Sequence, residues 1–179
     1  MTCIIAYVEG GKVYMGGDSA GSSEEFTSKR VQPKVFVKGE FCFGYTGSFR
    51  LGQIMEHCFD PSDLPKRGED VMKYMVRKFV PDLKMAFDLN DWPLHDDEKK
   101  VLGILVGVRG HLYEIEWDYQ VGEWDLPYFA IGSGAPYAMG AMHALHPSIL
   151  PATDKINLSL EAAKSFDPSV SGPFKIVVT

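Results

Sequence analysis

The order of hydrophobic patterns along the 179 residues predicts an α+β protein, a four-layer α/β/β/α sandwich built from two antiparallel sheets. Segments with strand-like patterning come in blocks, and blocks of helical patterning separate them. Such an order disfavours a parallel βαβ sheet, in which strands and helices alternate one by one. Short glycine-rich turns join neighbouring strands, which is typical of antiparallel pairing. The length fits one domain spanning residues 1–179.

The amino-terminal part is expected to start directly as a β-hairpin. Residues 3–8 are apolar and β-branched enough for a buried strand, and a Glu-Gly-Gly turn leads to a returning strand over 12–17. Next we expect a polar loop over 19–29, a strand over 31–37 that contains Lys34, a turn over 38–40, and a strand over 41–45 that ends at Thr46-Gly47-Ser48. Apolar residues at helical spacing then predict a helix over 51–58, which Asp60-Pro61 ends.

The middle of the chain combines a second helical pattern with a new block of strands. A linker over 63–67 leads to a helix over 71–79, which Pro81 breaks or kinks before residues 83–87 continue it. A solvated loop over 90–100 follows. The strands expected after it cover 101–108, 111–116, part of 118–125, and 128–131, the last of which runs into Gly132-Ser133-Gly134.

The carboxyl-terminal part is expected to hold two helices and one strand. Proline in the first turn and Pro147 just beyond the end both fit a helix over 136–145. Ser159 is in place to cap a last helix over 160–165. A loop over 167–172 and a strand over 174–178 complete the chain.

Composition excludes several classes of function. The net charge of -6 argues against a nucleic-acid binder, which needs a basic face. No apolar run approaches the roughly 20 residues of a membrane span, so we expect no membrane partner. The three cysteines form no metal-ligand spacing and cannot all pair, and no secretion signal precedes them, so we expect reduced thiols in a cytoplasmic protein. His143 and His146 could share a helix face, but no cysteine or acidic residue stands beside them, and we expect neither metal nor cofactor.

The start of the chain carries the candidate chemistry. Removal of Met1 would make Thr2 the amino-terminal residue, with its hydroxyl and a free α-amino group on the same residue. A hydroxyl is a poor nucleophile until a base takes its proton, and an α-amine with a pKa of about 8 can take it near neutral pH. Taken alone, Asp18 is typical of a turn and Lys34 of a protein surface. Their joint spacing from the start of the chain gains its meaning from the resemblance described next.

Five features together resemble the proteasome β-subunit and HslV-like peptidase family of N-terminal nucleophile hydrolases. They are Thr2 with the strand behind it, Gly17-Asp18, Lys34, Gly47, and the stretch Ala-Ile-Gly-Ser-Gly-Ala-Pro-Tyr-Ala over 130–138. The resemblance spans nearly the whole chain, from Thr2 to Ser171-Gly172. It implies the same four-layer sandwich that the hydrophobic patterns predict.

The resemblance also implies a role for each matching residue. Thr2 would be the nucleophile, with its own amine as the base, and Lys34 would lie beside its hydroxyl and stabilise the alkoxide-like state. Asp18 would keep Lys34 charged and oriented. The backbone N–H of Gly47 would stabilise the oxyanion of the tetrahedral intermediate. Ser133 would form a hydrogen bond with the α-amine.

Further residues would bind substrate or support the amine. Extended peptide would lie along an edge formed by Ser22 and Gly47 as an added strand, and Tyr45 would line the pocket for the side chain before the scissile bond. Asp167 and Ser171 would match a family aspartate and the serine of a Ser-Gly pair. The family spaces those two residues by three positions, whereas here they are four apart and Ser169 is two from Asp167.

The implied assembly is a self-compartmentalised homo-oligomeric ring that hydrolyses peptides or unfolded proteins, with an ATPase partner by analogy alone. Two alternatives stay open. One is a catalytically silent, structural ring subunit, which retention of Met1 would favour. The other is an amidase of the same fold that uses Cys3 after loss of both Met1 and Thr2.

Overall fold

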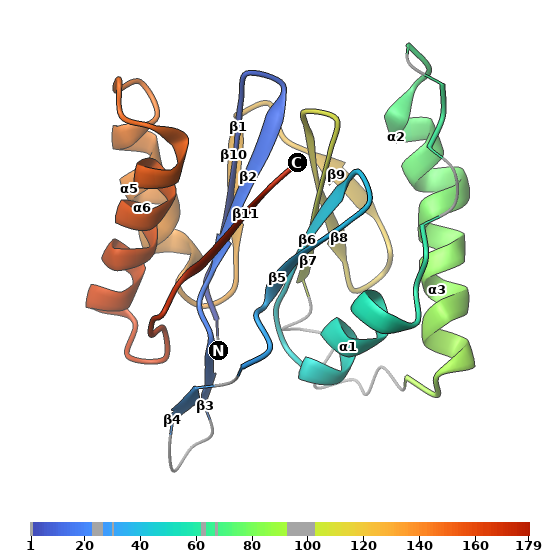
Figure 1. The fold of residues 1–179 in the computed structure, drawn as a ribbon, viewed down its shortest axis with the longest axis horizontal. Helices are drawn as coiled ribbons and strands as arrows, with labels where there is room; N and C mark the ends of the chain where they lie inside the picture. The colour runs from blue at the N-terminus through green and yellow to red at the C-terminus, as the bar shows by residue number, and fades with distance from the viewer. Residues whose placement is uncertain (1, 23–26, 30, 62–63, 67, 93–102) are drawn as a thin grey trace.

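The computed structural model of the chain describes residues 2–22, 27–29, 31–61, 64–66, 68–92 and 103–179. Two antiparallel sheets are stacked face to face, and helices cover the outer face of each sheet (Figure 1). The layers follow the order helices, sheet, sheet, helices. The four-layer sandwich expected from the sequence is therefore confirmed.

The first sheet has the strand order β10-β1-β2-β11. Its strands are β1 (Ile4–Glu9), β2 (Lys12–Gly17), β10 (Tyr128–Ile131) and β11 (Lys175–Val178). The hairpin register pairs Ile4 with Gly17, so Asp18 follows β2 right beside the start of β1. This pairing brings the first residues of the chain next to Asp18.

The second sheet has the strand order β5-β6-β7-β8-β9. Its strands are β5 (Val35–Lys38), β6 (Phe41–Tyr45), β7 (Gly103–Val108), β8 (His111–Glu116) and β9 (Val121–Glu123). Between the sheets, Ile4 and Met15 approach the backbone of Gly44 so closely that a Cβ there would lie 2.5 Å from Ile4 Cγ2. Glycine at this position lets the two sheets meet at the end that holds Thr2.

Two groups of helices form the outer layers. The first group is α1 (Phe49–His57), α2 (Val71–Tyr74), the π-helical turn η1 (Met75–Phe79) and α3 (Val80–Leu89), and the second is α5 (Ala135–Leu145) and α6 (Ala152–Phe166). Helix α6 lies close to the first sheet, since a Cβ on Gly16 would be 2.4 Å from Ile156 Cγ2. In the part of the chain that the structure describes, no helix combines the length and the apolar character that crossing a membrane requires.

The last helix begins eight residues earlier than the sequence pattern predicts. Helix α6 starts at Ala152, and Ser159 lies in its interior rather than at its amino-terminal cap. The Ser159 hydroxyl donates to the carbonyl of Lys155 at 2.8 Å, one turn back. Lys155 is itself buried. Its ammonium tolerates burial because it donates to Glu9 Oε1 at 3.0 Å and to the carbonyl of His146 at 3.2 Å. Because these polar residues lie on the buried face of α6, the first half of the helix lacks the apolar periodicity from which a helix is predicted.

Of the break or kink expected at Pro81, the break is wrong, because the helix continues through this residue, and the expected continuation over 83–87 is confirmed. The N–H of Val80 donates to the carbonyl of Met75, five residues back, in a π-type turn. A proline ring clashes with the carbonyl four residues back in a regular α-helix, and the wider π-turn makes room for it. The chain therefore passes from α2 through η1 into α3 without an interruption.

Two smaller expectations are corrected, and two others fall partly on residues that the structure does not describe. The polar loop over 19–29 contains a short hairpin of β3 (Ala20–Ser22) and β4 (Thr27–Lys29). Lys34 lies in a bend immediately before β5, not inside the strand. Residues 63 and 67 of the expected linker and residues 93–100 of the expected loop lie outside the described residues.

Candidate active site

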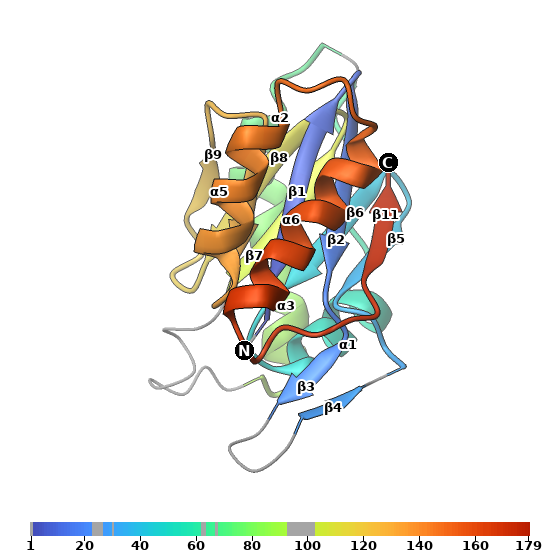
Figure 2. The same cartoon turned by 90° about the vertical axis from the view of Figure 1, so that its left-hand side faces the viewer.

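The chain begins at one end of the sandwich, close to the carboxyl-terminal end of α6 (Figure 2), and backbone hydrogen bonds fix Thr2 there. Its carbonyl accepts a hydrogen bond from the N–H of Gly134 at 3.2 Å, and the carbonyl of Cys3 accepts from the N–H of Asp18 at 3.2 Å. Gly132 has a φ of +95°, and a Cβ there would lie 2.2 Å from the Thr2 carbonyl oxygen. The turn between β10 and α5 therefore needs glycine in order to hold the chain at Thr2.

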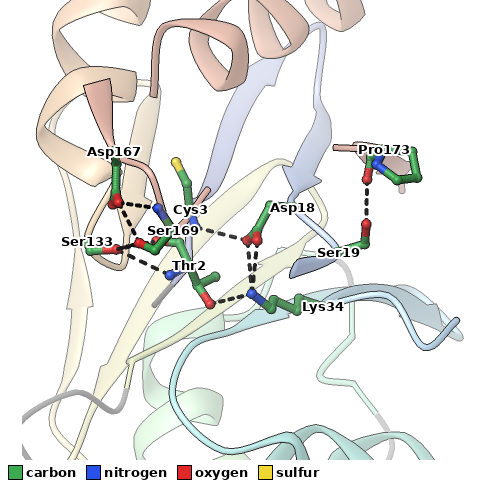
Figure 3. Close-up of polar contacts among 9 residues, drawn as sticks. All are labelled: Thr2, Cys3, Asp18, Ser19, Lys34, Ser133, Asp167, Ser169 and Pro173. Carbon is green, nitrogen blue, oxygen red and sulfur yellow. Dashed lines mark hydrogen bonds and ion pairs between the residues drawn. The ribbon is translucent and has the colours of Figure 1, made fainter. Parts of the chain in front are cut away.

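The Lys34 ammonium joins Thr2 to Asp18 (Figure 3). Lys34 Nζ lies 2.6 Å from Thr2 Oγ1, and 3.1 Å and 3.0 Å from the two carboxylate oxygens of Asp18. All three residues are buried, with exposed fractions of 3% for Thr2, 3% for Lys34 and 1% for Asp18. A hydroxyl that accepts from a buried ammonium has its alkoxide form stabilised, which favours nucleophilic attack.

The backbone holds both charged groups of this pair in place. Asp18 Oδ1 also accepts from the N–H of Cys3 at 3.1 Å, and the carbonyl of Lys34 accepts from the N–H of Tyr45 at 3.2 Å. Burial lowers the pKa of Lys34 below the ordinary value of a lysine, and the nearby Asp18 carboxylate opposes this effect. The ammonium therefore releases its proton more readily than that of a surface lysine.

A second polar group lies on the other side of Thr2. The N–H of Thr2 donates to Ser133 Oγ at 3.3 Å, and Ser133 Oγ lies 3.4 Å from Ser169 Oγ. The Ser169 hydroxyl donates to Asp167 Oδ1, and the Ser169 N–H donates to the same oxygen at 2.9 Å. Burial raises the pKa of Asp167, but hydrogen bonds from the Ser169 and Ser133 hydroxyls and from the Ser169 N–H together bring it below its ordinary value.

Ser169 is the residue at this site that sequence reasoning did not select. The signal was its position two residues after Asp167, because an aspartate often accepts from the N–H two residues on in an Asx turn. Ser171 lies two residues further along and is half-buried. Its role stays a prediction.

The three residues predicted to bind substrate, Gly47, Tyr45 and Ser22, differ in their solvent exposure and in how much of them the structure describes. Gly47 follows the end of β6, is exposed, and has a φ of +84°. The Tyr45 ring is 3% exposed and packs edge-on against Phe49, and a Cβ on Gly52 would come within 2.1 Å of it. The backbone of Ser22 lies in β3, and its side chain is outside the described part of the structure. Their substrate-binding roles stay predictions.

Cys3 is unsuited to nucleophilic chemistry in this structure. Its side chain is fully buried, and burial, together with the charges of Asp18 and Asp167, raises the pKa of the thiol to about 12. The reactive form of cysteine is the thiolate, which is scarce near neutral pH at such a pKa. Among the described residues, no cluster of three or more His, Cys, Asp or Glu side chains could hold a metal ion.

Three known proteins are similar to this chain over most of its length. The ATP-dependent protease subunit HslV of Aquifex aeolicus (strain VF5) is 30% identical over 167 residues, covering 90% of this chain and 88% of that protein. Thiobacillus denitrificans BPH, solved in complex with epoxomicin, superposes with a TM-score of 0.80 at 20% identity, covering 99% of this chain and 98% of that one. HslV from Trypanosoma brucei gives a TM-score of 0.70 at 19% identity, with the same coverages of 99% and 98%. No protein-family model matches the chain.

Proposed function

The chain belongs to the proteasome β-subunit and HslV-like peptidase family of N-terminal nucleophile hydrolases, and we propose that it is a threonine endopeptidase whose nucleophile is Thr2 after removal of Met1. One contact carries the proposal. Lys34 Nζ lies 2.6 Å from Thr2 Oγ1, inside a buried pair with Asp18. A lysine with only a structural role has no need to donate to the hydroxyl of the second residue of the chain.

In the first step, the Thr2 α-amine takes the proton of the Thr2 hydroxyl, and Oγ1 attacks the carbonyl carbon of the scissile amide. Lys34 stabilises the negative charge that grows on Oγ1, and Asp18 holds the ammonium in position. The pre-organised ammonium is worth more here than in water, because the site excludes solvent.

In the second step, the tetrahedral intermediate collapses to an ester of Thr2. The oxyanion accepts from the backbone N–H of Gly47, a donor typically worth about 2.7–4 kcal/mol of barrier. The α-ammonium gives its proton to the leaving nitrogen, so the amine product departs neutral. Water then attacks the ester with the same amine as the base, which restores the free hydroxyl of Thr2.

Substrate would bind as an extended strand beside Ser22 and Gly47, with Tyr45 at the pocket for the side chain before the cleaved bond. The relative in Aquifex aeolicus is a subunit of an ATP-dependent protease. This supports assembly of the present chain into a homo-oligomeric ring that acts on unfolded protein delivered by an ATPase. The cysteines are all free thiols, which supports a cytoplasmic location.

The test compares wild type with Thr2→Ala and Thr2→Ser on short fluorogenic peptides, after intact-mass measurement of the amino terminus. We expect a wild-type mass that lacks Met1, hydrolysis by wild type, reduced hydrolysis by Thr2→Ser, which keeps a hydroxyl, and none by Thr2→Ala. Equal activity of wild type and Thr2→Ala would refute the threonine mechanism. A processed but inactive wild type would instead favour the structural subunit.

A further inference from the structure

The turn between β6 and α1, which carries the Gly47 N–H proposed as the oxyanion donor, is held on both sides (Figure 1). On the α1 side, Ser48 caps the helix by accepting from the N–H of Arg50 at 3.1 Å. On the β6 side, Thr46 is only 4% exposed and bonds to Gly103, the first residue of β7. The donor N–H therefore lies between two fixed attachments.

The hydrogen bonds between Thr46 and Gly103 differ from those of a regular antiparallel ladder. The register pairs Tyr45 of β6 with Ile104 of β7, so Thr46 lies opposite Gly103. In a regular hydrogen-bonded pair, the two opposite residues exchange both N–H···O=C bonds of the main chain. Here the N–H of Thr46 donates to the Gly103 carbonyl at 2.9 Å, but the N–H of Gly103 donates to Thr46 Oγ1 at 3.0 Å. The hydroxyl therefore accepts where the ladder would use a main-chain carbonyl.

The Thr46 side chain also reaches the turn that holds Thr2. A Cβ on Gly132 would lie 3.2 Å from Thr46 Cγ2 and 2.2 Å from the Thr2 carbonyl oxygen, so Thr46 and Thr2 meet at this glycine. The Thr46 hydroxyl donates its own proton to the Gly103 carbonyl at 3.4 Å. Both groups on the Thr46 Cβ are thus engaged, and a β-branched side chain is stiff about χ1. The residue before Gly47 is locked in place beside Thr2.

We propose that Thr46 is the positioning residue of the oxyanion site, and that its hydroxyl acts by replacing a main-chain carbonyl in the β6–β7 ladder. This inference rests on the proposed function. The C=O of Thr46 and the N–H of Gly47 belong to one planar trans peptide and point in opposite directions. Because the hydroxyl accepts from Gly103, this peptide is able to rotate out of the ladder, and the rotation turns the Gly47 N–H toward the reacting carbonyl. The φ of +84° at Gly47 then lets the chain enter α1.

The test compares wild type with Thr46→Val, Thr46→Ser and Ser159→Ala. Valine keeps the shape of threonine without the hydroxyl, and serine keeps the hydroxyl without the methyl group. Ser159→Ala is the control, because it removes another fully buried hydroxyl, one that donates to the Lys155 carbonyl inside α6 at 2.8 Å.

Three quantities are measured for each folded variant: kcat on a fluorogenic peptide, the affinity for a peptide aldehyde, and the affinity for the matching peptide alcohol. The Thr2 hydroxyl adds across the C=O bond of the aldehyde, and the former carbonyl oxygen then occupies the oxyanion site. The alcohol has no carbonyl and reports binding of the peptide alone. Interactions made only in the transition state affect kcat and the aldehyde, and not the alcohol.

We expect Thr46→Val to lower kcat and the aldehyde affinity together by about tenfold, less than the roughly 100- to 1,000-fold loss typical of removing such a donor outright. The alcohol affinity of Thr46→Val should stay within about twofold of wild type, because ground-state binding is unchanged. Thr46→Ser and Ser159→Ala should keep all three quantities within about threefold of wild type.

Equal losses of aldehyde and alcohol affinity in Thr46→Val would give Thr46 a purely structural role and overturn the inference. If Thr46→Val does not fold, Thr46→Cys gives the same test, because a thiol is a weak acceptor for the Gly103 N–H. An inactive Thr2→Ala variant, combined with wild-type kcat and aldehyde affinity in Thr46→Val, would reject this inference and leave the threonine mechanism standing. Full activity in Thr2→Ala would reject the mechanism itself.

Discussion

Replacing Lys34 with methionine, alone and together with Asp18→Asn, separates folding from catalysis. In wild type, the ammonium lies 3.0 Å from Asp18 Oδ2, and both side chains are almost fully buried. Removing one partner of a buried ion pair typically costs about 3–5 kcal/mol, because the remaining charge stays in a poorly solvated place. That is a large part of a typical stability of about 5–15 kcal/mol.

The double variant removes both charges, and asparagine can still accept from the Cys3 N–H that Asp18 binds at 3.1 Å. We therefore expect it to recover most of the stability that Lys34→Met loses. Catalysis should not recover, because Thr2 Oγ1 no longer has its cationic donor, and loss of one such donor typically lowers kcat about 100- to 1,000-fold. Lys34→Met and the double variant should thus both be inactive, whereas only Lys34→Met should be strongly destabilised.

Urea unfolding at equal protein concentration gives the stabilities, and peptide hydrolysis gives the rates. Two results would refute the reasoning. One is a folded Lys34→Met variant with activity within about tenfold of wild type, which would place Lys34 outside the mechanism. The other is a double variant as unstable as Lys34→Met, which would mean that the buried Asp18 charge left behind in Lys34→Met is not the source of the loss.

Three further variants test other parts of the site and its support. Gly132→Ala should lower the melting temperature and abolish hydrolysis, because a Cβ at φ +95° would lie 2.2 Å from the Thr2 carbonyl oxygen. A melting temperature equal to that of wild type would contradict this prediction. Gly52→Ala should cost about 1–3 kcal/mol in urea unfolding, because the new Cβ overlaps the Tyr45 ring. Burial raises the pKa of Asp167, but hydrogen bonds from the Ser169 and Ser133 hydroxyls and from the Ser169 N–H together bring it below its ordinary value. Asp167 therefore adds stability above its unfolded pKa that is lost as pH falls through its lower native pKa. Asp167→Asn should flatten acid unfolding below about pH 4, and a curve as steep as that of wild type would argue against this shift.

The contact of Thr2, Asp18 and Lys34 could be anticipated because local rules determine much of it. The Glu-Gly-Gly turn sets the register of the first hairpin, which pairs Ile4 with Gly17 and places Asp18 beside Cys3. The position of Lys34 came from the family resemblance, since nothing in the local pattern predicts that the second sheet carries it to Thr2. The bend that holds Lys34 depends on the N–H of Tyr45, a contact between separate segments.

Other features depend on contacts that the sequence pattern does not encode. Lys155 looks like a surface residue in sequence, but it is buried because Tyr7, Glu9 and the His146 carbonyl accept from it. That exception concealed the first half of α6. Ser169 follows a helix in a loop without periodicity, so its contact with Ser133 becomes visible only when the fold brings the two loops together.

Trapping the acyl-enzyme tests the proposed chemistry most directly. The processed protein is mixed with a slowly hydrolysed peptide ester, quenched in acid, digested, and mapped by mass spectrometry. We predict an acyl group on the hydroxyl of Thr2 in wild type and none in Lys34→Met. An acyl group on Cys3, or continued turnover in a protein whose amino terminus is still Met1, would contradict the mechanism.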